Sequence, residues 1–196
     1  MTTLTAPEMS TRGGSIERTI AMAPSRELNK AIATNPDRSG YFWAFLRLGM
    51  GWIFLWAFVD KLFGLGFGTE AGKGWIDGGS PTFGFLSFAV SGPLEGFYNG
   101  LAGNAVVDWL FMLGLLAIGL PLVLGIGVRL AASIGVVMLL LMYSALVLPA
   151  NNPILDDHII YAVIMLGLAI ANPGYRLGLG RWWGKTRLVK RFPVLE

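Results

Sequence analysis

Long apolar segments with few charges restrict how this chain can fold more than any other feature. A membrane-spanning helix needs about 20 consecutive, mostly apolar residues. Three segments reach that length, at about residues 41–63, 106–124 and 130–148. A fourth, at about residues 154–171, is shorter and needs its first residues to complete a crossing. We therefore predict an all-α fold, an integral membrane four-helix bundle.

The scarcity of charge points to lipid as the surroundings of these helices. Of the 196 residues, 54% are hydrophobic and only 14% are charged, whereas about a quarter of a typical soluble domain is charged. The 27 glycines agree with this interpretation, because glycine is more frequent in membrane helices than in soluble ones. The expected partner is a lipid membrane, and no nucleic-acid partner is expected.

The distribution of lysine and arginine predicts the orientation. Cytoplasmic segments accumulate these residues. Residues 1–40 carry five of them, residues 176–196 carry six, and the turn at 125–129 carries Arg129. The other side carries two lysines against seven acidic residues. This predicts a multi-pass protein of the plasma membrane with both termini cytoplasmic: a disordered arm over 1–40, a transmembrane domain over 41–175 and a basic tail over 176–196.

The predicted outer loop, residues 64–105, is long and rich in glycine, serine and proline. It contains TFGFLSFAV (82–90), which is apolar but too short to span. We predict a short helix there that lies in the membrane interface or is tucked into the bundle. An ordinary lid loop with aromatic anchors is the alternative.

Six ionisable residues fall at the outer ends of the predicted spans. They are Asp60 and Lys61 after the first, Asp108 at the second, and Asp156, Asp157 and His158 at the fourth. Charged groups near hydrocarbon are costly and usually face the bundle, where they pair with one another. Alternatively, these are polar helix ends, and the aspartates complement helix dipoles.

The only histidine of the chain carries the sharpest functional hypothesis. On a helix, His158 and Asp157 each share a face with Tyr161. An imidazole, a carboxylate and a phenol can hold and pass a proton near neutral pH, and they can hydrogen-bond a quinone carbonyl. We predict His158, Asp157 and Tyr161 as catalytic residues and Asp156 and Asp108 as cofactor-binding residues. A purely structural histidine is the alternative, and we predict no metal site because there is one imidazole.

Arg47 lies inside the first span, 14 residues before Lys61, so the two cations fall within about 40° of each other around the helix. Either Arg47 reaches lipid phosphates or Asp37, or it faces the bundle and binds an anionic or carbonyl-bearing ligand. Lys61 can likewise extend to the interface. In the second interpretation, Arg47 and Lys61 are cofactor-binding residues.

The chain has no cysteine, which excludes disulfides and cysteine-ligated iron–sulfur clusters in this chain. One histidine cannot supply two axial ligands to a haem, and no nucleotide-binding motif is present. An electron path would therefore need a bound quinone or a partner protein.

Three stretches resemble the DoxX/DoxD family of membrane proteins. LRLGMGWIFLWAFVDKLF (46–63) resembles the family's first helix, GLPLVLGIGVRLAA (119–132) its glycine-and-arginine turn, and LDDHIIYAVIMLGLAI (155–170) its last helix. The loop GWIDGGSPTFGFLSF (74–88) is similar to the DoxD-like branch. The resemblance implies a four-helix membrane bundle. It also implies the large subunit of a thiosulfate:quinone oxidoreductase, which pairs with a small subunit.

The leading hypothesis is thus a membrane subunit of a quinone-linked oxidoreductase with its site near the outer face. A small redox subunit or a soluble oxidoreductase is an expected partner, and a homo-oligomer is a further expectation. Two alternatives stay open: a non-enzymatic scaffold that docks a redox or stress enzyme through the basic segments, and a transporter of a small solute or lipid.

Overall fold

The computed structural model describes residues 38–147, 152 and 154–195, and all the named elements in this part of the chain are helices. The predicted N-terminal arm, residues 1–40, lies almost entirely outside the described residues. The elements in chain order are α3 (Arg38–Phe63), η1 (Trp75–Asp77), η2 (Phe85–Ala89), α4 (Glu95–Asn99), α5 (Ala105–Leu124), α6 (Val128–Ala145), α7 (Asp157–Ala171), η3 (Pro173–Tyr175), α8 (Gly180–Trp183), α9 (Arg187–Arg191) and η4 (Pro193–Leu195).

Three of the four predicted spans are helices long and apolar enough to cross a membrane, namely α3 from Ser39 onward, α5 and α6. The chain is therefore a membrane protein by the length and composition of its helices. The fourth apolar helix, α7, has 15 residues, or about 22 Å at 1.5 Å per residue. This is shorter than the roughly 30 Å of a bilayer core, because the helix begins only at Asp157.

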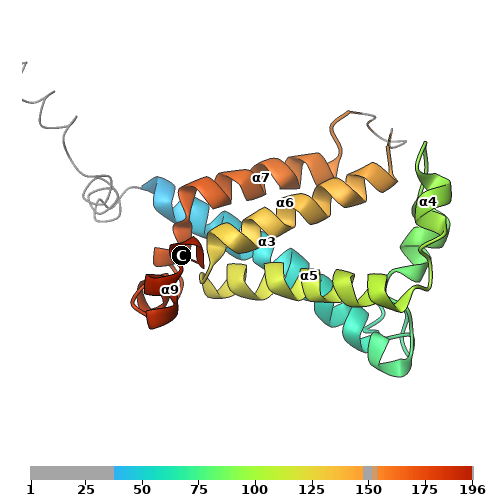
Figure 1. The fold of residues 1–196 in the computed structure, drawn as a ribbon, viewed down its shortest axis with the longest axis horizontal. Helices are drawn as coiled ribbons and strands as arrows, with labels where there is room; N and C mark the ends of the chain where they lie inside the picture. Colours follow the sequence, from blue (N-terminus) through green and yellow to red (C-terminus); the bar gives the residue numbers. More distant parts are fainter. Residues whose placement is uncertain (1–37, 148–151, 153, 196) are drawn as a thin grey trace, which may run out of the picture. The chain divides into compact units, whose positions relative to one another are not determined.

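Helices α3, α5, α6 and α7 pack along one another, and Figure 1 shows α7 lying beside α6 while α5 lies beside α3. The core between them contains Met112, Ile118 and Leu122 of α5 and Met165 and Leu168 of α7, all with no exposed surface. Only about a third of the most apolar window of each long helix is buried, 28% in α3 and 33% in α5 and α6. The remaining apolar surface requires lipid or another protein.

Close contact between α3 and α5 depends on two glycines. A Cβ on Gly119 would lie 2.5 Å from the backbone nitrogen of Leu55, and one on Gly51 would lie 2.8 Å from that of Val123. No side chain fits at such distances. Small residues therefore let the two backbones touch, as is usual between membrane helices.

The loop between α3 and α5, which we predicted to be on the outer side, contains the predicted short helix. Residues 85–89 form a π-helical turn, η2, followed by α4, and Figure 1 shows α4 beyond the ends of α5 and α6. Backbone and side-chain contacts join this loop to the end of α6: Ser91 N–H donates to the Ala145 carbonyl at 3.0 Å, and the Tyr98 and Ser144 hydroxyls lie 2.5 Å apart. We call residues 82–99 the strap, because Thr82 at its start contacts α5 and Tyr98 near its end contacts α6.

Candidate functional site

Arg47 of α3 is completely buried, and its side chain forms hydrogen bonds to backbone carbonyls of the protein. Its Nη1 donates to the carbonyls of Leu122 and Val123, the latter at 3.1 Å. Its Nη2 donates to the carbonyls of Leu177 at 2.8 Å and Arg176 at 3.3 Å. The guanidinium thus binds carbonyls at the end of α5, which helix geometry leaves without partners, together with the chain that follows η3.

Glycine makes this meeting of backbones possible. Gly125 has a φ of 73° at the end of α5, and a Cβ there would lie 3.0 Å from both the Gly174 carbonyl oxygen and the Gly178 Cα. Leu177 adopts a φ of 50°, which is unusual for a bulky residue, and presents its carbonyl to Arg47. Of the two expectations for Arg47, the structure shows the side chain facing the interior, with its two Nη atoms occupied by backbone carbonyls rather than directed to a ligand.

Asp108 of α5 is buried as well, and it holds the start of the strap. Its Oδ1 accepts hydrogen bonds from the Ser80 hydroxyl at 2.9 Å, the Thr82 N–H at 3.1 Å and the Thr82 hydroxyl at 2.6 Å. Ser80 and Thr82 were not among the predicted site residues. The sequence signals for this contact are the polar Ser-Pro-Thr stretch at 80–82 and the aspartate near the start of the apolar segment at 106–124.

Lys61 and Asp60 end α3 in different surroundings. The Lys61 ammonium lies 5.9 Å from the centroid of the Phe111 ring, within the range of a cation–π contact. Asp60 is buried and accepts a hydrogen bond from the Phe67 N–H at 3.3 Å. Next to them a shallow recess of about 410 Å³ is lined by Leu62, Trp75, Ile76 and Trp109, in which the two tryptophan rings meet edge to face at 4.5 Å.

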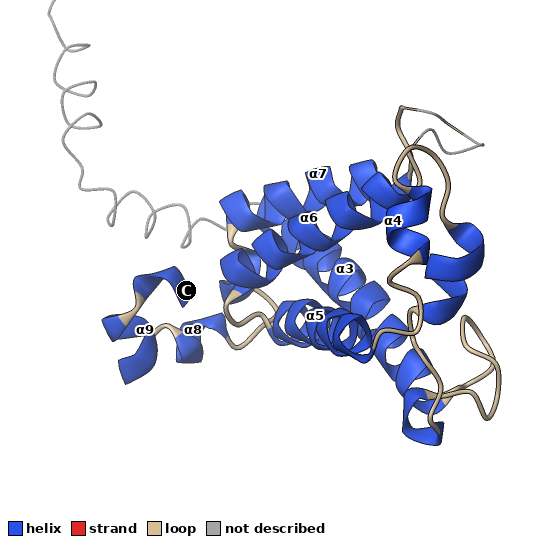
Figure 2. Cartoon of the chain, turned by 45° about the vertical axis from the view of Figure 1, so that its right-hand side comes forward, coloured by secondary structure: helices blue, strands red, loops and turns tan. Residues whose placement is uncertain are grey.

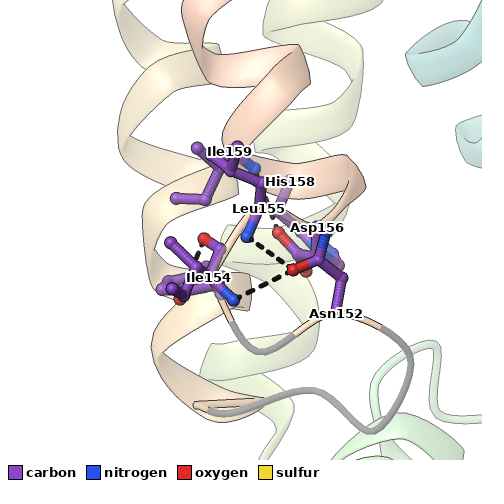
Figure 3. Close-up of polar contacts among 7 residues, drawn as sticks. Asn152, Ile154, Leu155, Asp156, His158 and Ile159 are labelled. Carbon is purple, nitrogen blue, oxygen red and sulfur yellow. Dashed lines mark hydrogen bonds and ion pairs between the residues drawn. The ribbon is translucent and has the colours of Figure 1, made fainter.

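His158 forms the most chemically suggestive pair. Its Nδ1 lies 2.7 Å from Oδ2 of Asp156, and the side chains are 20% and 12% exposed (Figure 3). Oδ1 of Asp156 accepts the Ile159 N–H at 3.1 Å and caps α7. An ionised carboxylate only accepts hydrogen bonds, so Nδ1 carries the proton. No described residue hydrogen-bonds to the second ring nitrogen, Nε2.

The approach to α7 is ordered by short-range contacts. The Asn152 side-chain oxygen accepts the N–H groups of Ile154 and Leu155, each at 3.2 Å (Figure 3). The Tyr143 hydroxyl donates to the Ile154 carbonyl at 3.5 Å. These contacts, together with the cap at Asp156, orient the His158–Asp156 pair at the beginning of the helix.

The predicted grouping of His158, Asp157 and Tyr161 differs from the observed arrangement. The imidazole pairs with Asp156, while Asp157 is exposed and Tyr161 packs half-buried against the core. Asp156 precedes the helix in an extended conformation, with φ −96° and ψ −179°, and can fold back onto the ring. Asp157 is already in the first turn.

The outer ionisable residues do not form one site in the described part of the chain. Asp108 contacts the strap, Lys61 contacts Phe111, and His158 contacts Asp156. No hydrogen bond or ion pair joins these three groups among the described residues. In the described part of the chain these residues therefore form separate polar clusters, and the His158–Asp156 pair is the one that contains an imidazole.

Hydrogen bonding changes the acidity of Asp156, which lies just before α7. Burial raises the pKa of this carboxyl group, but hydrogen bonds from His158 and from the Ile159 N–H lower it by more. The pKa of Asp156 therefore lies below its ordinary value, and the ionised form is favoured in the folded protein.

This lowered pKa gives a pH-dependent prediction for Asp156→Asn, which keeps a capping oxygen but removes the charge. We expect the variant to lose about 1 kcal/mol of unfolding free energy at pH 7. A carboxyl group with a lowered folded-state pKa stabilises fully above its unfolded pKa of about 4 and loses this contribution as the pH falls through the folded value. Thermal midpoints of variant and wild type should differ at pH 5–7 and converge at lower pH. A difference in thermal midpoint that does not shrink below pH 5 would contradict the assignment of a lowered pKa to Asp156.

Comparison of the chain with family models, with curated proteins and with solved structures finds no match.

Proposed function

We propose that this chain is a membrane subunit of a quinone-linked oxidoreductase, related to the DoxX/DoxD family. The observation that carries the proposal is the His158–Asp156 pair, in which a carboxylate orients an imidazole and leaves its second nitrogen without a described partner. A carboxylate that fixes the tautomer and orientation of a histidine is a recurrent device for proton transfer. A thiosulfate:quinone type of reaction is the specific version that the sequence resemblance suggests.

The proposed topology has four crossings, α3, α5, α6 and α7, with both termini on the cytoplasmic side of the plasma membrane. The basic character of residues 176–195 and of the α5–α6 turn supports this orientation, since lysine and arginine accumulate on that side. The shortness of α7 is met by local thinning of the bilayer. His158 then lies at the outer face.

The pair itself carries groups that suit the headgroup of a quinone: an imidazole whose second nitrogen has no described partner, and a carboxylate that orients the ring. A bound quinone would supply two-electron redox chemistry with proton uptake and release. His158 holds or gives up a proton at Nε2, and Asp156 keeps the ring oriented and stabilises its charged form. Lys61, predicted to polarise a quinone oxygen, lies over the Phe111 ring and is not joined to the His158–Asp156 pair. The Nη atoms of Arg47 and Oδ1 of Asp108 are engaged in internal hydrogen bonds. The electrons enter from a partner subunit.

The proposal predicts the effect of changing His158. Protein purified gently in detergent should carry extractable quinone, identified by mass spectrometry. His158→Gln should reduce quinone turnover with a reconstituted electron donor by about 100-fold or more, because general acid–base groups contribute roughly that much. His158→Ala should also reduce the bound quinone.

Asp77→Asn is the control, because Asp77 is an exposed carboxylate in the loop between α3 and α5 rather than at the start of α7. Its quinone content and turnover should equal those of the wild type. Full turnover in folded His158→Gln would eliminate the site assignment. Absence of quinone from every variant and from the wild type would leave Asp156 and His158 as a helix cap and favour the scaffold hypothesis.

We also propose that the strap lies in the outer membrane interface. Phe88 is 81% exposed and Phe97 63%, and Asp108 and Ser144 tie the strap to the outer ends of α5 and α6. A surface of exposed aromatic rings with a single charged residue, Glu95, is typical of the interface. Since the chain has no cysteine, a nitroxide on Phe88→Cys in liposomes should be more accessible to oxygen than to a water-soluble nickel chelate.

Ala71→Cys provides the comparison for the strap, because Ala71 is exposed in the polar part of the same loop. A label there should show the opposite preference. Equal access of the nickel chelate to both positions would place the strap in water.

A further inference from the structure

Residues 176–195 form a small folded unit, which we call the basic module. It contains α8, α9 and η4 and is closed by a hydrogen bond of 2.6 Å from Trp183 Nε1 to the Leu195 carbonyl. Thr186 caps α9 by accepting the Val189 N–H at 3.4 Å, and Val189 is buried. The surface of this unit is therefore preformed rather than assembled on binding.

The basic module is attached where two apolar helices meet. Leu179 N–H donates to the Leu124 carbonyl at 2.8 Å, and η4 contacts α6. A Cβ on Gly180 would lie 2.6 Å from the Gly174 backbone, so no side chain separates the module from η3. Figures 1 and 2 both show α9 near the α5–α6 turn. Because α5 and α6 are long enough to cross a membrane, their shared end places the module at a bilayer surface.

The module combines positive charge with exposed apolar side chains. No acidic residue occurs between positions 176 and 195. Its exposed cations are Arg181, Lys185, Arg187, Lys190 and Arg191. No carboxylate among the described residues forms an ion pair with any of these five. Each of three exposed apolar residues directly follows one of these cations: Trp182, Leu188 and Phe192, which are 63%, 49% and 48% exposed.

We propose that the basic module binds anionic phospholipid headgroups of the leaflet at the α5–α6 turn. Its cations contact the phosphates, while Trp182, Leu188 and Phe192 enter the boundary between headgroups and acyl chains, where aromatic rings are favoured. The covalent attachment to α5 and α6 keeps this surface against lipid at all times, which favours lipid over a soluble acidic protein as the occupant. Basic juxtamembrane segments are attracted to anionic lipid in this way.

The test uses spin-labelled lipids to measure the lipid selectivity of the full chain. The protein is reconstituted in liposomes of phosphatidylcholine with 20 mol% phosphatidylglycerol, a composition chosen for the assay. The wild type should hold spin-labelled phosphatidylglycerol in preference to spin-labelled phosphatidylcholine. Each cation removed should lower this preference by up to about fivefold. Arg187→Gln/Lys190→Gln/Arg191→Gln should therefore abolish it, and high salt should weaken it in the wild type.

The matched control removes three cations from the N-terminal segment, as Arg12→Gln/Arg18→Gln/Arg26→Gln, which gives the same net charge. This control should retain the preference. Equal loss in the two triple variants, or no preference in the wild type, would overturn the proposal. Trp182→Ser tests the apolar part separately. In this variant the phosphatidylglycerol preference should fall only partly. A complete loss would show that charge is not what selects the lipid.

Discussion

Arg47→Met is expected to lower the free energy of unfolding by about 3 kcal/mol or more and to release residues 176–195 from the helices. The guanidinium is completely buried and binds four backbone carbonyls. Methionine fills part of the volume but donates no hydrogen bond. The carbonyls of the α5 end and of Arg176 and Leu177 would then be buried without a donor, and each such group costs roughly 1–3 kcal/mol.

Two measurements check this expectation in detergent. Thermal unfolding reports the global loss, and limited proteolysis reports early cleavage within 176–195, which the wild type should resist. Arg129→Met is the control, because it makes the same chemical change at an exposed position of α6. If Arg47→Met unfolds and is cleaved like the control, the carbonyl contacts do not hold the C-terminal part of the chain.

The fate of Arg47 shows where prediction from sequence ends. The pattern around it indicates a buried or membrane-facing cation, but its acceptors are backbone carbonyls 75 to 130 positions away. Every residue has a carbonyl, so no residue type marks these partners. The one sequence signal is the pair of glycines at 125 and 127. Both have a positive φ in the structure, in the turn where the backbones meet. A buried arginine without an acidic partner was therefore ambiguous until the fold was known.

The helices were easier to anticipate than the site. Length and apolar character predicted α3, α5 and α6, because lipid-facing segments need both. The limit of α7 depended on Asp156 capping the helix instead of continuing the span. The same cap decides the partner of His158, since helical spacing describes neighbours only inside the helix. Asp156 lies outside it, so helical spacing, which grouped His158 and Asp157 with Tyr161, could not identify Asp156 as the partner of His158.

Asp108→Ala is the second large effect that we expect, with a loss of about 3 kcal/mol of unfolding free energy localised in residues 64–104. One carboxylate oxygen accepts three hydrogen bonds from Ser80 and Thr82. Hydrogen bonds to charged groups contribute roughly 1.5–3 kcal/mol each, and part of this is offset because the buried charge is removed too. The start of the strap would lose its attachment to α5 while its contact with Ser144 remained.

Hydrogen exchange of residues 64–104 is the measurement that separates this from global unfolding. Amides near Thr82 should exchange much faster in Asp108→Ala, whereas those in the middle of α5 and α6 should change little. Thr82→Val removes one donor and should give a partial effect, and the two substitutions together should cost less than their sum because they share a contact. Asp77→Ala, at an exposed aspartate of the same loop, should leave exchange unchanged. Protection near Thr82 that survives in Asp108→Ala would mean that packing of Leu86, which is buried, holds the strap without the carboxylate.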